Sequence, residues 1–227
     1  KLQLKLAKKL SKCGKPLILV LNIGRPRLIS EIEPFMSAVL NIYLPGNLGA
    51  DALVDIINGK VNPSGKLPYT YPAFPNSLTT YYYKPSEVQN NSQGAYNYVG
   101  KLNNLYEFGY GLSYTNFEYK DITIEDDSIG ADDSLNISLT VYNSGDVDGQ
   151  EVVQVYVSDL FASITPDNKR LRAFDKVFIK SGENKKVSFS IPVKDFSFVN
   201  LENKYVLESG DFTVHVGGNS KDLTSLN

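Results

Sequence analysis

The chain has 227 residues, 42% of them hydrophobic and 21% charged, and its 23 Lys and Arg against 25 Asp and Glu give a formal net charge of −2. This composition is typical of a folded globular protein, and the near-neutral charge disfavours nucleic acid or an anionic membrane surface as a partner. A single cysteine and a single histidine exclude an internal disulfide and a multi-histidine metal site within these residues.

The first 70 residues combine helix and strand patterns. Leucines four residues apart over residues 2–10 predict a short amphipathic helix that ends near Gly14. The apolar runs at 17–21 and 37–44 are typical of strands covered on both faces in a parallel sheet, and both are too short to cross a membrane. Residues 49–58 predict a second helix. The pattern indicates an α/β layer.

About 70 residues cannot cover both faces of such strands. The sequence also begins with Lys1 and shows no apolar leader. We therefore expect the sheet, and the natural N-terminus, to extend upstream of residue 1.

From residue 118 onward the apolar period changes to two, as in half-buried antiparallel strands. Turn clusters rich in Gly, Asn, Ser and Asp separate the runs, which predicts a β-sandwich of roughly seven strands. His215 alternates with two inward valines, so we expect its ring to face solvent. The runs with the clearest alternation are residues 134–142, 152–157, 186–191 and 212–216.

The stretch 72–111 is rich in Pro, Asn, Gly and Tyr and has little periodicity, which favours a long ordered connector. The predicted organisation is an α/β part over residues 1–75, a connector over 76–117 and a β-sandwich domain over 118–227.

Several segments carry a resemblance to a known family. Among them NPSGKLP at residues 62–68 and FGYGLSYT at 108–115, in this order and spacing, are the most specific pair. Together with further blocks they resemble glycoside hydrolase family 3 almost from end to end. The further blocks are GKPLILVLNIGRP (14–26), YLPGNLGADALVDIINGK (43–60) and VYNSGDVDGQEVVQVYVSD (141–159).

The resemblance implies a parent with an N-terminal (β/α)8-type barrel, an α/β sandwich domain and a C-terminal fibronectin type III-like domain. This chain would hold the end of the second and all of the third. The implied fold is α/β, a partial α/β sandwich with parallel strands, followed by an all-β immunoglobulin/fibronectin III-like sandwich.

The implied activity of the parent is retaining hydrolysis of terminal β-linked glucose from oligosaccharides, without a cofactor or metal, in a secreted or periplasmic enzyme. The Asp nucleophile and the Glu acid/base of the family match no position here, so both are expected upstream, with the barrel as a partner domain. A retaining glycosidase needs both carboxylates about 5–5.5 Å apart, so we expect this chain alone to be inactive. The alternative is a non-catalytic scaffold module that binds carbohydrate or protein.

Four residues are candidates for substrate binding: Arg25, Tyr82, Lys84 and Glu87. Arg25 follows a strand where open α/β sheets bind ligands, although a structural ion pair that ends the strand is the preferred interpretation. The other three belong to YYYKPSEVQNN at 81–91, where rings can stack on sugars or equally pack the connector onto a domain. Lys66 and the tyrosines of FGYGLSYT are interpreted as structural.

The β-sandwich has two possible roles, a buttress for the catalytic domains or a weak polysaccharide anchor. Its predicted strands show no evenly spaced exposed aromatic row, so we favour the buttress.

Overall fold

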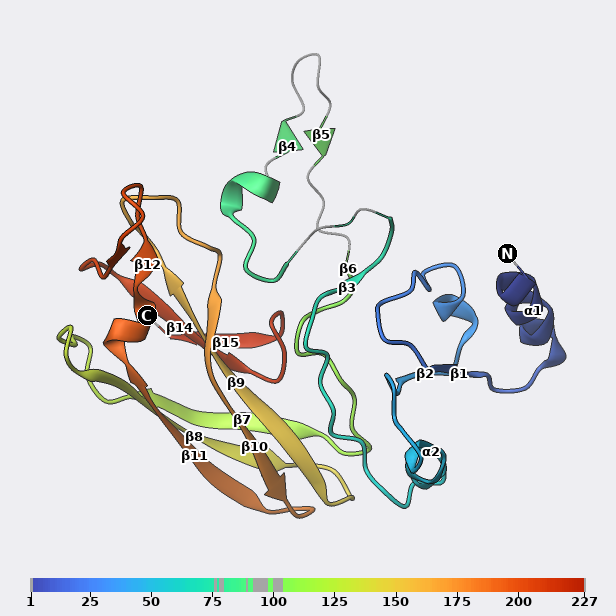
Figure 1. Cartoon of the computed structure of the whole chain (residues 1–227). Coiled ribbons are helices and arrows are strands. Elements are labelled where there is room, and N and C mark those ends of the chain that lie inside the picture. Colours follow the sequence, from blue (N-terminus) through green and yellow to red (C-terminus); the bar gives the residue numbers. More distant parts are fainter. Residues whose placement is uncertain are drawn as a thin grey trace. The chain divides into compact units, whose positions relative to one another are not determined.

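The structure, a computed structural model, describes residues 2–75, 77, 80–88, 90–91, 98–99 and 104–226 (Figure 1). The chain divides into two compact units. The α/β unit comprises Lys1–Val61, Thr70–Thr79 and Asn103–Tyr106, and the sandwich unit comprises Asn62–Tyr69, Thr80–Leu102 and Glu107–Asn227. The predicted domain limits at residues 75 and 117 stay a prediction.

The α/β unit contains the predicted helices and parallel strands. In β1 and β2 the chain runs parallel, with Ile18 opposite Ala38. Gly14 has φ 63°, the left-handed conformation expected where the first helix stops. No helix in the described part of the chain is long and apolar enough to cross a membrane. The elements are α1 (Leu2–Leu10), η1 (Ser11–Cys13), β1 (Ile18–Leu21), η2 (Glu33–Phe35), β2 (Ala38–Asn41), α2 (Gly49–Ile57), β3 (Tyr71–Pro72) and β6 (Asn104–Tyr106).

The strands of this unit are incompletely covered by the 227 residues. Ile18 and Val20 of β1 remain 44% and 37% exposed, and α1 buries no residue. This exposure agrees with the expectation that these residues alone cannot cover both faces of such strands. The physical reason is that a two-stranded parallel sheet has too few neighbouring strands and helices to cover its faces.

Tyr71 holds the antiparallel pair β3 and β6 in the unit. Its side chain is 1% exposed, and its hydroxyl donates to the carbonyl of Arg27 at 2.8 Å. Its ring meets that of Tyr106 edge to face at 5.9 Å, and Tyr106 in turn donates to Glu33 at 3.1 Å. Part of the predicted connector thus packs as a short strand pair.

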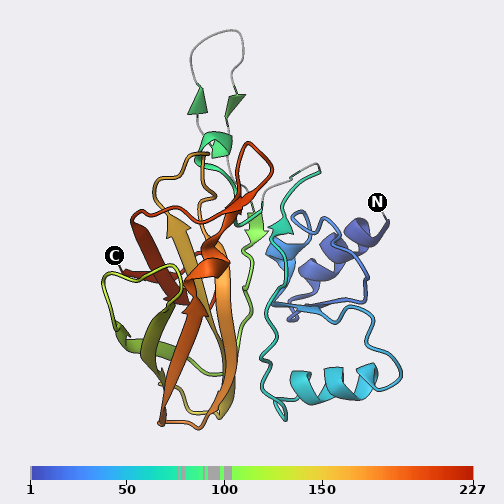
Figure 2. The same ribbon diagram turned by 60° about the vertical axis from the view of Figure 1, so that its left-hand side comes forward.

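The sandwich unit confirms the predicted β-sandwich. One sheet has the strand order β11-β8-β7 and the other β10-β9-β14-β15, and Figure 2 shows them as two layers. Alternate residues of the long strands point inward and form one core, for example Ile137, Val155 and Val216. The strands are β7 (Phe117–Ile124), β8 (Ser134–Asn143), β9 (Gly149–Asp159), β10 (Arg170–Ile179), β11 (Asn184–Pro192), β14 (Phe212–Gly217) and β15 (Leu223–Leu226). Shorter elements are η3 (Pro85–Val88), β4 (Asn90–Asn91), β5 (Tyr98–Val99), η4 (Val193–Phe196), β12 (Phe198–Val199) and β13 (Tyr205–Val206).

Strand β9 departs from the half-buried pattern predicted for it. Its outward residues Gln154, Tyr156 and Ser158 are 2%, 0% and 8% exposed, although the valines between them already fill the core. A sheet face turned to solvent would not bury such residues. The outer face of this sheet is therefore covered around these three residues by other segments of the sandwich unit.

Candidate functional site

The predicted substrate-binding residues are divided between the two units. Arg25 is exposed in the loop after β1 of the α/β unit. Tyr82, Lys84 and Glu87 belong to the sandwich unit, in one segment that leads into and through η3. We call this segment, residues 80–88, the connector strap.

Tyr81 attaches the connector strap to the outer face of β9. Its ring stacks on Phe108 with centroids 4.3 Å apart and meets Tyr156 edge to face at 5.6 Å. Its hydroxyl accepts a hydrogen bond from the backbone N–H of Leu171 at 3.3 Å. Aromatic pairs of this geometry contribute beyond the area they bury. The contacts explain why Tyr156 is inaccessible.

Tyr82 and Lys84 are held by the first residue of β10 and by the loop that precedes this strand. The guanidinium of Arg170 lies 4.2 Å from the centre of the Tyr82 ring, and its Nε donates to Asp167 Oδ2 at 2.5 Å. Lys84 Nζ lies 3.4 Å from the other oxygen of Asp167 and donates to the carbonyl of Thr165 at 2.5 Å. Asp167 thus serves two cations, one from the strap and one from the sheet.

Glu87 shapes the strap itself. Its carboxylate accepts from the backbone N–H of Lys84 at 2.8 Å, and its own N–H donates to the carbonyl of Lys84 at 2.9 Å. This reciprocal pair resembles a capping box and satisfies the open N–H at the start of η3. A role of Arg25, Tyr82, Lys84 and Glu87 in substrate binding stays a prediction.

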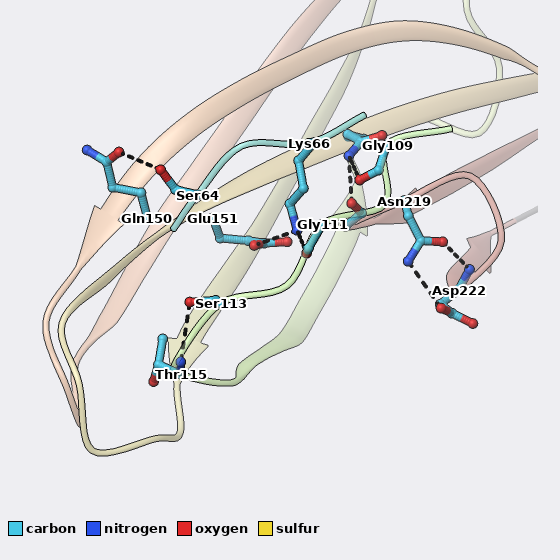
Figure 3. Close-up of polar contacts among 12 residues, drawn as sticks. Ser64, Lys66, Gly109, Gly111, Ser113, Thr115, Gln150, Glu151, Asn219 and Asp222 are labelled. Atoms are coloured by element: carbon cyan, nitrogen blue, oxygen red, sulfur yellow. Dashed lines mark hydrogen bonds and ion pairs between the residues drawn. The ribbon is translucent and has the colours of Figure 1, made fainter. Parts of the chain in front are cut away.

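A second cluster centres on Glu151 of β9, which is 4% exposed. Lys66 Nζ lies 3.2 Å from Glu151 Oε2 and donates to the carbonyl of Gly111 at 3.1 Å, as Figure 3 shows. The hydroxyl of Tyr119 donates to the other carboxylate oxygen at 2.9 Å. Burial, followed by the charge of Glu151, raises the pKa of Tyr119, so it stays a neutral donor.

The same cluster joins the two most specific sequence motifs. Leu67 of NPSGKLP exchanges backbone hydrogen bonds with FGYGLSYT, donating to Tyr110 at 2.9 Å and accepting from Gly109 at 2.8 Å. Gly109 has φ 78°, and a Cβ there would collide with the side-chain amide of Gln154. That amide donates to the carbonyl of Gly218 at 2.6 Å. Both motifs are therefore parts of one structural joint on the sandwich unit.

His215 lies in a hydrogen-bonded row across the outer face of the sheet, rather than facing solvent as predicted. Ser158 Oγ donates to the carbonyl of Asn168 at 2.6 Å, so His215 Nε2, 2.8 Å away, must be the donor to Ser158. Its Nδ1 then accepts from Ser225 at 2.8 Å. Burial, followed by the charge of Lys169, lowers the pKa of His215.

Sequence reasoning missed several of these groups. Gln154 is a polar residue inside an apolar run, which could have marked a covered outer face. Asp167 and Arg170, opposite charges three residues apart, could have suggested an ordered loop. Nothing in the local sequence tied Asp167 or Arg170 to the connector strap, because Tyr82 and Lys84 are more than 80 residues away.

The contacts of these groups position segments of chain. The carboxylates of Glu87, Glu151 and Asp167 each accept from backbone, tyrosine or cationic partners. In the part of the chain that the structure describes, no three His, Cys, Asp or Glu side chains gather in a way that could hold a metal ion.

Comparisons with known proteins agree with this organisation. The sequence model of the glycosyl hydrolase family 3 C-terminal domain matches residues 1–114, and that of the fibronectin type III-like domain matches residues 151–220. These matches support the expected fold, the end of an α/β domain followed by a fibronectin III-like sandwich.

Individual relatives match almost the whole chain. A putative beta-xylosidase of Formosa agariphila is 38% identical over 217 residues, which is 96% of this chain and 28% of that protein. A periplasmic beta-glucosidase of Salmonella typhimurium is 36% identical, over 91% of this chain and 28% of its own length. The chain therefore spans less than a third of these relatives.

Solved structures give the same result. The beta-glucosidase of Listeria innocua in complex with glucose superposes with a TM-score of 0.90 and 33% identity, over 99% of this chain and 32% of that one. The beta-glucosidase of Erythrobacter marinus superposes with a TM-score of 0.90 and 36% identity, over 99% of this chain and 29% of that one. With a family model that matches half of its residues and relatives that match it nearly from end to end, the chain belongs to glycoside hydrolase family 3.

Proposed function

We propose that this chain is the C-terminal portion of a retaining β-glycosidase that removes terminal β-linked glucose from oligosaccharides. The observation that carries the proposal is the match of 91% of the chain to a periplasmic beta-glucosidase of which it spans only 28%. The Asp nucleophile and the Glu acid/base belong to upstream residues, with the barrel as the partner domain.

The exposed faces of the α/β unit support this assignment. Ile18 and Val20 of β1 and Leu2, Leu6 and Leu10 of α1 are all more than a third exposed. Such residues occur in strands and helices that pack on further layers. An α/β sheet that continues upstream provides those layers.

Within the parent, this chain has a structural role. The sandwich unit holds the connector strap through Asp167 and Arg170 and holds the NPSGKLP segment through Glu151. We propose contact with substrate only for the four residues predicted from sequence, which are Arg25, Tyr82, Lys84 and Glu87.

A second substrate class is β-linked xylose. Two relatives from Formosa agariphila, at 38% and 36% identity, are named a putative beta-xylosidase and a beta-xylosidase. Glucose and xylose differ by one hydroxymethyl group, so the two activities are separated by comparing aryl β-glucoside with aryl β-xyloside at equal concentration.

The test is hydrolysis of these two aryl glycosides by the full-length gene product and by the 227-residue chain. We expect turnover of at least one substrate by the full-length protein, with the β-anomer as first product in proton NMR, and none by the chain alone. Hydrolysis by the chain alone contradicts the proposal, as does a folded full-length protein that cleaves neither substrate and instead only binds glucans.

We also propose that the parent is secreted or periplasmic. The support is the name of the Salmonella typhimurium relative, a periplasmic beta-glucosidase. Fractionation of the producing cells, followed by immunodetection, tests this. Retention in the cytoplasmic fraction contradicts it.

A further inference from the structure

The outer face of the sheet β10-β9-β14-β15 is only partly covered. Towards one end, Tyr156 and Ser158 of β9 are buried under the connector strap and neighbouring loops. Towards the other end, Phe174 and Phe178 of the edge strand β10 are 67% and 48% exposed. Covered and uncovered parts belong to one continuous sheet.

The strand register places these phenylalanines on that outer face. Phe174 lies opposite the outward Gln154, and Phe178 lies opposite Gln150. Lys176, between them on β10, lies opposite Val152 of β9. We call the patch formed by Val152, Phe174 and Phe178 the β10 apolar face.

The other sheet shows what a face turned to water looks like in this protein. On the outer face of β11-β8-β7 the paired positions are polar throughout the centre. Lys186 pairs with Thr140, Ser188 with Ser138, and Ser190 with Asn136. Antiparallel sheets commonly bury one face and solvate the other, so the polar face is the solvated kind. The outer face at β10 differs, because two exposed phenylalanines flank Lys176 there.

We propose that the β10 apolar face packs against the upstream part of the same polypeptide, the part in which the proposed function places the catalytic domains. Two observations and one general rule favour this occupant. The face continues a sheet surface that is already covered by the connector strap, a segment of the sandwich unit that lies outside its two sheets. The relatives are more than three times as long as this chain, so a large upstream part is at hand. Exposed apolar patches of this kind mark interaction sites.

The chemistry of the patch favours protein over polysaccharide. Phenylalanine has no polar atom to bind sugar hydroxyls. The neighbouring outward glutamines are engaged, since Ser64 bonds Gln150 at 3.3 Å and the Gln154 amide donates to Gly218 at 2.6 Å. A sugar platform needs aromatic faces together with convergent polar groups.

Hydroxyl-radical footprinting tests the proposal on unaltered protein. The rates of side-chain oxidation at Phe174 and Phe178 are compared between the full-length gene product and the 227-residue chain. We expect several-fold protection of both rings in the full-length protein. Tyr142, on the polar outer face of β8, serves as the control and should react equally in both proteins. Equal oxidation of Phe174 and Phe178 in both overturns the proposal.

A pair of variants gives a second readout. Phe174→Ser with Phe178→Ser should leave the thermal midpoint of the 227-residue chain unchanged or higher, and lower the midpoint of the full-length protein by several degrees. The matched control, Ser188→Ala with Ser190→Ala on the polar face, should behave alike in both. The proposal is overturned if the phenylalanine variant leaves the full-length midpoint unchanged and instead loses a dimer or the retardation by glucan. Either loss would assign the face to another occupant.

The two proposals fail separately. A full-length protein that hydrolyses aryl glycosides while its phenylalanines remain unprotected refutes only the docking of the β10 apolar face. A full-length protein without hydrolytic activity refutes the proposed function, and the footprint still reports whether upstream chain covers the face.

Discussion

Replacing Lys66 with methionine tests how strongly the buried pair with Glu151 holds the NPSGKLP segment on the sandwich. The side chains are 15% and 6% exposed, and the charged atoms are 3.2 Å apart. At an effective dielectric constant of about 20, their attraction is about 5 kcal/mol before desolvation is subtracted. Removal of one partner leaves the carboxylate buried and uncompensated, which typically costs about 3–5 kcal/mol. Because Lys66 keeps some contact with water, we expect a loss near the lower end, about 3 kcal/mol.

The assay is urea unfolding of the 227-residue chain, followed by far-UV circular dichroism. Lys204→Met is the matched control, because its pair with Glu202 has a similar distance of 2.9 Å but side chains 71% and 69% exposed. That variant should lose less than about 0.5 kcal/mol. Glu151→Gln in the Lys66→Met background should restore part of the stability, since the amide still accepts from Tyr119. Equal losses in Lys66→Met and Lys204→Met refute the reasoning.

Three further predictions concern the same unit. Gly109→Ala places a Cβ against Gln154 at a φ of 78° and should lower the free energy of unfolding by about 2 kcal/mol or more, whereas Gly182→Ala, at φ 73° with open space, should lose only about 1 kcal/mol in the same urea assay. The pKa of His215 is lowered in the folded state, so the unfolded chain binds the proton more readily, and stability falls as the pH drops through the unfolded value of about 6.5. His215→Gln should reduce the slope of unfolding free energy against pH between about 5 and 7, and an unchanged slope contradicts the neutral ring. Asp167→Asn weakens the hold on both Lys84 and Arg170, so chymotrypsin should cut after Tyr82 or Tyr83 several-fold faster than in wild type, while a Glu202→Gln control should be cut at the wild-type rate.

Regular elements could be predicted from local pattern. The two helices, the parallel pair β1 and β2, and the alternation in β8, β9, β11 and β14 all lie where the periods of 3.6 and 2 place them. Each of these patterns reports the environment of nearby residues only, which is why the inward faces were found.

The outward faces could not be predicted in the same way. Tyr156 is buried against Tyr81, 75 residues away in sequence, and Gln154 is buried against Gly109 and Gly218, 45 and 64 residues away. The same distance in sequence hid the pairing of Lys84 with Asp167. The exposure of Ile18 in β1 follows from the opposite situation, because its apolar run reflects neighbours that these 227 residues do not supply.

The candidate site was foreseen only in part. The sequence pointed to the tyrosine-rich segment after residue 80, and the structure shows that its residues Tyr81, Tyr82 and Lys84 contact other segments of the sandwich unit. Resemblance to glycoside hydrolase family 3 supplied the expectation that the reacting carboxylates lie elsewhere, and no feature of local periodicity could have done so.

The most direct test of the central claim is to trap the catalytic nucleophile. The full-length gene product is incubated with an activated 2-deoxy-2-fluoro-β-glucoside, which leaves the glycosyl group on the attacking carboxylate of a retaining enzyme. The labelled peptide is then identified by mass spectrometry. We predict a label on an aspartate upstream of Lys1. A label on any carboxylate within these 227 residues contradicts the account.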